Sequence, residues 1–365
     1  MALKKLPLSD FHRSLGARMG VFSGWEMPLY YRSIREEYFS CINSCGLFDI
    51  SHLGKFFLRG KEVTSFLDYA TCRQVSKVKE GKGKYTFFLN WRGGIVDGTT
   101  IFREKEEWIL VSNAGAREKL FHWLDYLIKN QKWEVEVEDV TEKKTFFALQ
   151  GPQAQQIVRQ LFPVPNDNWP KFSFRQFSPG FRIIHLAFSR EDGFEIMSDV
   201  SLGLEWWKKL VEEVERRGGA LCGLGARDLL RFEATFPLYG QEIDETTTPL
   251  ELGREDLIDW EKDDFIGKKP LLLEKEEGSK KKLVGLEILG RRIPRYGYPL
   301  YTKEGMPCGY VTSGNYSFSW HKVLALGFVN PIYGVEGNTL LVAAPWTKLE
   351  ARIIGLPFAK GGLSI

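Results

Sequence analysis

The spacing of apolar residues predicts that helices and strands alternate along most of the chain. Apolar side chains recur every three or four positions, the period of an amphipathic helix, over 33–43, 117–130, 153–161 and 204–215. Short runs rich in aromatic and β-branched residues lie between these segments, and two of them flank Trp91–Gly94 as a hairpin. This alternation favours an α+β fold, and a length of 365 residues favours more than one domain.

Beyond residue 282 the pattern changes to short β runs separated by glycine turns. A charged segment, 274–282, precedes these runs and contains Gly278 and Ser279, a composition typical of a domain boundary. The sequence therefore predicts two units, residues 1–275 and residues 276–365, the second a small β-barrel or sandwich. The predicted strands of the second unit are 283–288, 308–313, 323–329, 339–342 and 349–354.

A helix followed by a loop is predicted for Gly223–Asp244. Gly223 and Gly225 suggest a tight entry into the helix with positive φ. Arg227 and Arg231 lie one turn apart, and two arginines at the start of a short helix can hold a carboxylate between them. An ordinary amphipathic helix with a solvated charged face is the commoner cause of the same spacing.

Composition narrows the class of protein. Apolar residues make up 43% and charged residues 27%, as in ordinary soluble globular proteins, and a net charge of +3 is too small to indicate nucleic-acid binding. Aromatic residues in 24–31 are expected on an exposed loop. The chain has neither an apolar signal-peptide core after Met1 nor a run of 18 apolar residues, so no membrane span is predicted.

The five cysteines predict free thiols rather than a disulfide framework. Their number is odd and they are scattered along the chain, which favours a reducing compartment and hence a cytoplasmic protein. Cys41 and Cys45 lie at helical spacing, but no further Cys or His pair completes a set of four ligands. We therefore expect two buried thiols and no metal site.

Four tracts of the chain are unusually specific. They are Gly-Trp-Glu-Met-Pro at 24–28, Gly-Leu-Phe-Asp-Ile-Ser-His-Leu-Gly at 46–54, Gly-Leu-Gly-Ala-Arg-Asp at 223–228 and Leu-Tyr-Gly-Gln at 238–241. They resemble motifs of the aminomethyltransferase family, which includes the T-protein of glycine cleavage, and the resemblance extends from about Leu15 to about Phe358.

The resemblance implies both a fold and a function. The implied fold has two intertwined α+β subdomains around a folate channel, with a C-terminal β-barrel. The implied function is that of an enzyme that moves the methylene carbon of an aminomethyl group, carried on the lipoyl arm of the H-protein, onto tetrahydrofolate with release of ammonia.

The resemblance assigns Glu195 to the pterin. The tract Asp-Gly-Phe-Glu at 192–195 matches the family carboxylate that binds this ring. An ionised carboxylate can accept hydrogen bonds from both the ring N–H and the adjacent amino group of a pterin. A strand-edge glutamate in water is the alternative. His52, in another of the motifs, is expected to be a structural histidine whose hydrogen bonds are made.

Five further residues are candidates for folate binding. Arg227 matches a ligand-contacting arginine of the family. Leu53 and Tyr85 match positions that line the folate pocket, where apolar and aromatic side chains would pack against a flat ring. Asn113 and Tyr239 are the remaining candidates, and a structural role is equally compatible with the sequence for each.

The position of the catalytic acid departs from the family pattern. The family hairpin has Gly-Gly-Ile-x-Asp-Asp, whose second Asp is catalytic, whereas this chain has Gly-Gly-Ile-Val-Asp-Gly at 93–98. Asp97 is the remaining catalytic candidate, but adjacent side chains of a strand point to opposite faces. Asp97 would face the channel only if a bulge shifted the register. Loss of one such electrostatic group costs roughly 10²–10³ in rate.

Other departures keep a second function open. The loop at 189–195 is five residues shorter than in the family, the tail 358–365 lacks a terminal arginine pair, and Phe102 and Phe236 stand where the family has tyrosine. The alternatives are a folate-binding paralogue without glycine-cleavage activity, either another demethylase or a regulatory or assembly factor, and a relative that no longer binds folate. The Lys-Gly-Cys motif of the assembly-factor branch is absent.

Overall fold

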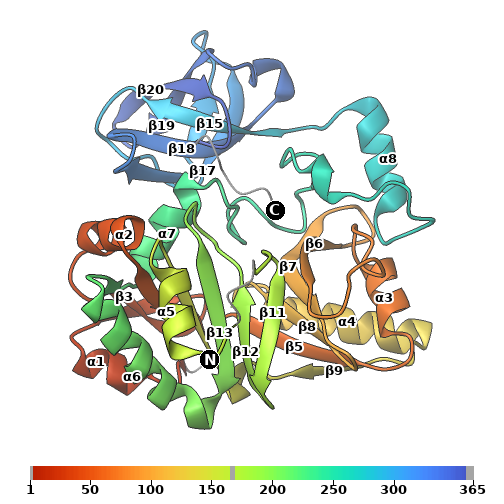
Figure 1. Ribbon diagram of the computed structural model, residues 1–365. Coiled ribbons are helices and arrows are strands. Elements are labelled where there is room, and N and C mark those ends of the chain that lie inside the picture. The colour runs from red at the N-terminus through yellow and green to blue at the C-terminus, as the bar shows by residue number, and fades with distance from the viewer. Residues whose placement is uncertain (1–2, 165–168, 359–365) are drawn as a thin grey trace.

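The computed structural model describes residues 3–164 and 169–358, which form two sheet-based units with a barrel above them (Figure 1). A small sheet near the N-terminus has the order β1-β3-β2. The predicted exposed loop at 24–31 is wrong, because most of it is strand β3 and Trp25 is buried with Met27. The elements are β1 (Lys4–Lys5), α1 (Ser9–Ser14), β2 (Arg18–Phe22) and β3 (Trp25–Tyr30).

The first unit is an antiparallel sheet with the order β6-β7-β8-β5-β9. Two helices pack on one face, where Phe66 and Leu67 of α3 and Leu120 and Leu124 of α4 join the sheet residues in one core. The predicted hairpin around Trp91–Gly94 is confirmed as β6 and β7. The elements are β5 (Gly54–Arg59), α3 (Val63–Ala70), β6 (Gly83–Leu89), β7 (Ile95–Arg103), β8 (Trp108–Ser112), α4 (Arg117–Gln131) and β9 (Glu136–Asp139).

The second unit is a sheet with the order β11-β12-β13-β10-β4-β14. Helices α5 and α6 pack on one face of it through Ile157, Trp207 and Leu210. The elements are α2 (Ile34–Asn43), β4 (Gly46–Asp49), η1 (Thr141–Lys143), β10 (Lys144–Gln150), α5 (Ala154–Leu161), β11 (Ser173–Ser178), β12 (Phe181–His185), β13 (Gly193–Asp199), α6 (Val200–Arg216), β14 (Ala220–Leu221) and α7 (Leu224–Glu233).

The two units are interwoven at Ile50–Leu53. Strand β4 belongs to the second sheet and β5 to the first, so the chain crosses between them in this short turn. A shared core joins Phe48 and Phe146 of the second unit to Val111 of the first and Leu229 of α7. Any cavity in this core is therefore walled by both sheets.

The predicted positive φ at the start of α7 is wrong. Gly223 has φ −96° and ψ −175°, and neither it nor Gly225 has a positive φ. Glycine is required there for space instead, since a Cβ on Gly223 would collide with the Leu29 carbonyl group and lie 2.6 Å from Tyr30 N. Close packing of α7 against β3 thus fixes the direction in which Arg227 leaves the helix.

The C-terminal unit is a closed barrel with the order β15-β18-β17-β16-β19-β20. All five predicted strands are present, and the short strand β16 completes the ring. Helix α8 (Lys268–Glu277) runs across the predicted boundary at 275/276 and, with η2 (Glu255–Leu257), leads to the barrel. The elements are β15 (Lys282–Ile288), β16 (Pro299–Tyr301), β17 (Pro307–Ser317), β18 (Lys322–Val329), η3 (Pro331–Tyr333), β19 (Thr339–Ala344) and β20 (Thr347–Ile354).

Three features bear on the class of protein. All five cysteines are free and buried. Within the described ranges, no group of three or more His, Cys, Asp or Glu side chains could hold a metal ion, and none of the helices is long and apolar enough to cross a membrane. The departure noted in the tail at 359–365 lies outside the residues that the structure describes.

Candidate functional site

A pocket enclosing about 630 Å³, its open mouth included, lies between the two sheets. The first wall comes from the β6–β7–β8 side and consists of Leu53, Tyr85, Gly98, Thr100, Val111, Ser112 and Asn113. The second wall comes from β13, the segment after β12 and helix α7, and consists of Leu186, Ala187, Phe188, Glu195 and Arg227. Phe172 and Phe236 complete the lining. Five of the seven residues predicted for the site are thus brought together.

Glu195 is a buried acid whose Oε2 atom has no hydrogen-bond partner among the described residues. It lies in the middle of β13, paired with Ala148 and Ile184 of the neighbouring strands, and is only 4% exposed. Burial raises the pKa of its carboxyl to about 8, against a weaker opposing effect of Arg227. Its Oε2 atom has no partner among the described residues, whereas buried polar atoms in folded proteins are normally hydrogen-bonded. An unsatisfied oxygen in a pocket wall is a binding position for a ligand donor.

Arg227 lies in the same wall and is also unsatisfied. Its guanidinium carbon sits 4.5 Å from the centre of the Phe188 ring, a cation–π distance, and its Nε has no partner among the residues described. Burial lowers its pKa to about 10, which still leaves it charged at neutral pH. No ion pair within 4.0 Å joins it to Glu195 in the described part of the chain. The two groups therefore remain available to a ligand.

Arg231 does not share this role. It pairs with Asp228 at 2.7 Å and with Glu242 at 3.3 Å, and its Nη2 reaches Ser313 of the barrel at 3.5 Å. The prediction that the two arginines hold one carboxylate is therefore wrong. Although they lie one helical turn apart, Arg227 lines the pocket and Arg231 contacts the barrel.

Asp97, the second buried acid, lies on β7 next to Gly98 but does not line the pocket. A bulge shifts the pairing of β6 and β7, so that Leu89 pairs with Ile95 and Phe88 with Asp97. Gly98 lines the pocket and Asp97 does not. The bulge considered from the sequence thus exists, and the carboxylate nevertheless lies behind the wall.

Asp97 is fully hydrogen-bonded in its place. Its Oδ1 accepts from Asn113 Nδ2 at 2.8 Å and from Gly98 N at 2.9 Å, and its Oδ2 accepts from Asn113 N at 3.1 Å. Burial still raises its pKa to about 8, although these three hydrogen bonds act in the opposite direction. Within the described ranges, the hydrogen bonds of Asp97 therefore connect it to the pocket through Asn113 and Gly98.

The side chain of Tyr85 covers Gly98. A Cβ added to Gly98 would collide with the Tyr85 hydroxyl oxygen and lie 2.9 Å from its Cζ atom. Edge-to-face contacts with Phe87 and Phe236 fix the Tyr85 ring, at centroid distances of 5.5 and 5.7 Å. Burial raises the pKa of Tyr85, so its phenol stays protonated at neutral pH.

Tyr239 lies outside the pocket lining. It is partly exposed beside Gly115, and the Lys119 ammonium is 5.7 Å from its ring centre. Of the predicted site residues, Asp97 and Tyr239 are thus the two that do not line the cavity.

Sequence analysis missed polar groups next to the pocket. Ser112 Oγ is buried in the pocket wall and has no partner in the part of the chain that the structure describes, and a serine at the end of a strand gives no sequence signal. The expectation that His52 has its hydrogen bonds made is wrong for the described residues, since both ring nitrogens are buried and unpartnered. Burial, followed by the charges of Arg227 and Lys55, lowers the pKa of His52 and keeps it neutral.

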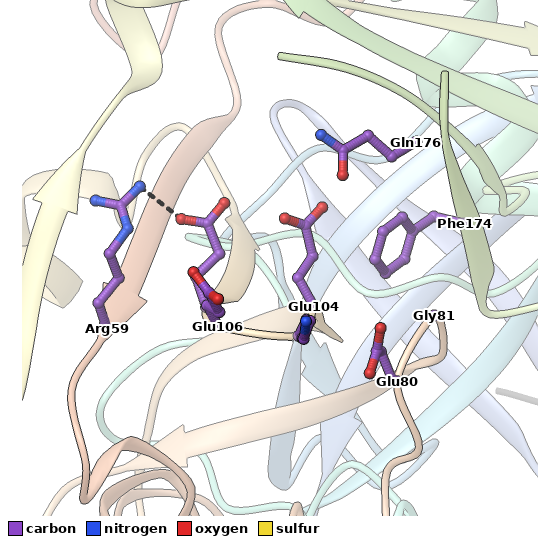
Figure 2. Close-up of a pocket in the computed structure, with 9 residues that line it drawn as sticks. Arg59, Glu80, Gly81, Glu104, Glu106, Phe174 and Gln176 are labelled. Carbon is purple, nitrogen blue, oxygen red and sulfur yellow. Dashed lines mark ion pairs between the residues drawn. The ribbon is translucent and has the colours of Figure 1, made fainter. Parts of the chain in front are cut away.

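A larger surface cavity has a different character (Figure 2). Among the described residues, it is lined by acids of the loop between β7 and β8 and of the loop before β6, with Phe174 as its one aromatic residue. Two of the acids are paired, since Glu107 pairs with Arg59 at 2.5 Å, the ion pair dashed in Figure 2, and Glu104 pairs with Arg182. The other two, Glu80 and Glu106, are exposed to solvent. In the part of the chain that the structure describes, none of the residues lining this cavity has a buried polar side-chain atom without a partner, unlike those of the pocket between the sheets.

Comparisons with known proteins cover nearly the whole chain. The family model described as the GCVT N-terminal domain matches residues 8–262, and that of the glycine cleavage T-protein C-terminal barrel domain matches residues 281–360. The chain is 38% identical over 366 residues to an aminomethyltransferase of Thermotoga petrophila, with 99% of each covered, and 36% identical over 368 residues to one of Thermoanaerobacter pseudethanolicus, with 98% of each covered. The solved structure of the glycine cleavage system aminomethyltransferase T from Bartonella henselae matches with a TM-score of 0.92 at 31% identity and covers 98% of both chains.

Proposed function

The chain belongs to the aminomethyltransferase family of glycine cleavage T-proteins, and we propose that the pocket between its two sheets is where it binds tetrahydrofolate. The resemblance inferred from the sequence motifs is confirmed by these comparisons. One observation carries the proposed site. An acid and a base, Glu195 and Arg227, line the same cavity, and each has a buried polar atom without a partner among the described residues.

In this proposal Glu195 binds the pterin. Its carboxylate accepts the ring N–H and the adjacent amino group, a donor pair that supplies the partner Oε2 lacks. Arg227 completes the polar end, while Phe188, Leu53 and Val111 pack against the flat ring. A few polar groups among apolar walls are typical of a small-molecule site.

The family reaction moves one carbon atom from the sulfur and the amine nitrogen of the donor to two nitrogens of the folate. In the donor the carbon is bonded to a sulfur and to an amine, and in the product it is bonded to two folate nitrogens. A thiol and ammonia leave, and they take up the two protons that the folate nitrogens give away. The residues of this pocket would bind the folate, hold its nitrogens in place and exclude water.

We also propose that the carbon donor is the aminomethyl-loaded lipoyl arm of an H-protein. The alternative is a folate-binding paralogue that uses another donor. Gly98 is the feature that favours this alternative, because it leaves no carboxylate in the first wall of the pocket.

A coupled assay tests the function. Purified protein is mixed with tetrahydrofolate and a lipoylated, aminomethyl-loaded H-protein, and both ammonia and methylenetetrahydrofolate are measured. We expect stoichiometric formation of both products, and a large loss in Glu195→Gln. Folate binding by calorimetry without turnover would favour the paralogue, and the absence of both would contradict the proposed site.

A further inference from the structure

The first wall of the pocket offers neutral hydrogen-bonding groups to a ligand, while the acid next to them, Asp97, lies behind the wall. Asn113 Nδ2 donates to Asp97 Oδ1 at 2.8 Å and to the Gly98 carbonyl oxygen at 3.1 Å. Both partners are acceptors, so the amide nitrogen must face them. The Asn113 carbonyl oxygen, Oδ1, is left without a partner among the described residues, and Asn113 lines the pocket.

The hydroxyl of Tyr85 lies against the same glycine. Gly98 has no Cβ, and the Tyr85 oxygen occupies the space that a side chain at this position would need. The hydroxyl has no hydrogen-bond partner in the described ranges, and Tyr85 lines the pocket. Tyr85 of β6 and Asn113, which follows β8, therefore reach Gly98 from the two strands beside β7, and they bring a donor, Tyr85 Oη–H, and an acceptor, Asn113 Oδ1, to the same part of the wall.

We propose that this neutral pair, Tyr85 Oη and Asn113 Oδ1, binds the reacting nitrogens in this chain, and that Asp97 is a positioning residue that acts through Asn113. The inference rests on the proposed folate site. An amine N–H donates to Asn113 Oδ1, while Tyr85 Oη–H donates to a nitrogen lone pair. Asp97 contributes by fixing the orientation of the Asn113 amide, and glycine at 98 is what allows the Tyr85 hydroxyl to reach the wall.

Two variants test the hydroxyl. Tyr85→Phe removes one oxygen and keeps the ring between Phe87 and Phe236. Gly98→Ala adds a Cβ that displaces the same oxygen. We expect each to lower kcat by about tenfold or more while the KM for tetrahydrofolate changes by less than about threefold, the pattern of a group that acts mainly in the transition state. The double variant should be no slower than the slower single variant, because both changes remove the same interaction.

Tyr126→Phe is the matched control, since Tyr126 is half exposed on α4 and its variant should match the wild type. Asp97→Asn should lower kcat, and Asn113→Leu should lower it as much, since both remove the oriented Oδ1. Full kcat in Tyr85→Phe, or additive losses in the double variant, would overturn the proposal.

The behaviour of the wild-type protein distinguishes a failure of the neutral-pair proposal from a failure of the proposed folate site. A wild type that binds folate and turns over no donor until Gly98→Asp restores a carboxylate would also overturn the neutral pair, while leaving the folate site in place. A wild type that does not bind folate would contradict the proposed function itself.

Discussion

Two buried acids, Glu195 in the pocket lining and Asp97 behind it, differ in the hydrogen bonds that they receive. Glu195 and Asp97 are both buried, and burial raises the pKa of each to about 8. Asp97 receives three hydrogen bonds from Gly98 and Asn113, whereas Oε2 of Glu195 receives none from the described residues. One acid is therefore complete without a ligand and the other is not.

This difference separates structural acids from binding acids better than burial or pKa does. An unsatisfied buried carboxylate lowers the stability of the free protein. The stability rises again when a ligand supplies hydrogen-bond donors. A satisfied carboxylate gains nothing from a ligand and instead holds its neighbours. We infer that the second wall provides affinity and that the first wall provides the geometry of the reaction.

The largest effect is expected from removing the charge beside Glu195. Arg227→Met keeps length and packing on Phe188 but leaves the Glu195 carboxylate, which is ionised in the folate complex, without a nearby positive charge. Truncating a charged group that is buried against its partner in a complex costs about 2–5 kcal/mol, so folate affinity should fall by at least about 30-fold. Calorimetric titration with a stable formyl-folate measures it. An unchanged affinity would mean that the second wall does not bind the ligand.

Stability of the free protein should distinguish the two acids next. Asp97→Asn places an NH₂ group where the Asn113 backbone N–H now donates, which leaves a buried donor unpaired and should cost about 1–3 kcal/mol of unfolding free energy. Glu195→Gln removes no hydrogen bond and should leave stability unchanged or raise it. Urea unfolding of both variants at pH 7 compares them, and equal losses would erase the distinction.

The pH dependence of binding sharpens the comparison further. A carboxyl with a pKa of about 8 is mostly protonated at pH 7, whereas a pterin's donors favour its ionised form. Folate binding should therefore release a proton, and affinity should rise with pH by up to about tenfold per unit until about pH 8. Glu195→Gln should abolish this dependence and Asp97→Asn should keep it. Calorimetry in buffers of different ionisation enthalpy counts the proton.

The raised pKa of Glu195 also predicts how the unfolding free energy of the free protein changes with pH. A carboxyl whose pKa is raised from 4.5 to about 8 on folding stabilises the free protein fully below about pH 4.5. That contribution is lost as the pH rises through about 8. The unfolding free energy of Glu195→Gln should therefore fall less steeply over this window than that of the wild type.

The smallest effect is expected from the ring under Arg227. Phe188→Leu keeps an apolar wall but removes a cation–π contact with the guanidinium. Such contacts contribute about 0.5–2 kcal/mol, so folate affinity should fall between about two- and thirtyfold. A loss as large as that of Arg227→Met would instead indicate that Phe188 contributes to affinity mainly through its own contact with the ligand and not through Arg227.

Most elements followed from the sequence, because their apolar period matched their burial. Strand β3 did not, since its aromatic residues were expected on an exposed loop, and its pairing with β2 includes a register shift between Arg18 and Met19. Gly223 was expected to need a special φ, but space against Leu29 was the real constraint. Such constraints come from segments far apart in the chain.

The site was predicted in the same uneven way. Glu195, Arg227, Leu53 and Tyr85 were matched to family positions, Asn113 was a further candidate, and the structure places all five around one pocket. The direction of Asp97 could not be derived, because it depends on a bulge that only the partner strand β6 defines. The contact of Tyr85 with Gly98 depends on that register as well.

The most direct test is one calorimetric series at pH 8, with a stable formyl-folate titrated into wild type, Glu195→Gln and Asp97→Asn. The account predicts at least a tenfold loss of affinity, about 1.4 kcal/mol, for Glu195→Gln and less than about a threefold loss for Asp97→Asn. A large loss for Asp97→Asn beside an unaffected Glu195→Gln would mean that the hidden acid binds the folate, and it would contradict the assignment of the two walls.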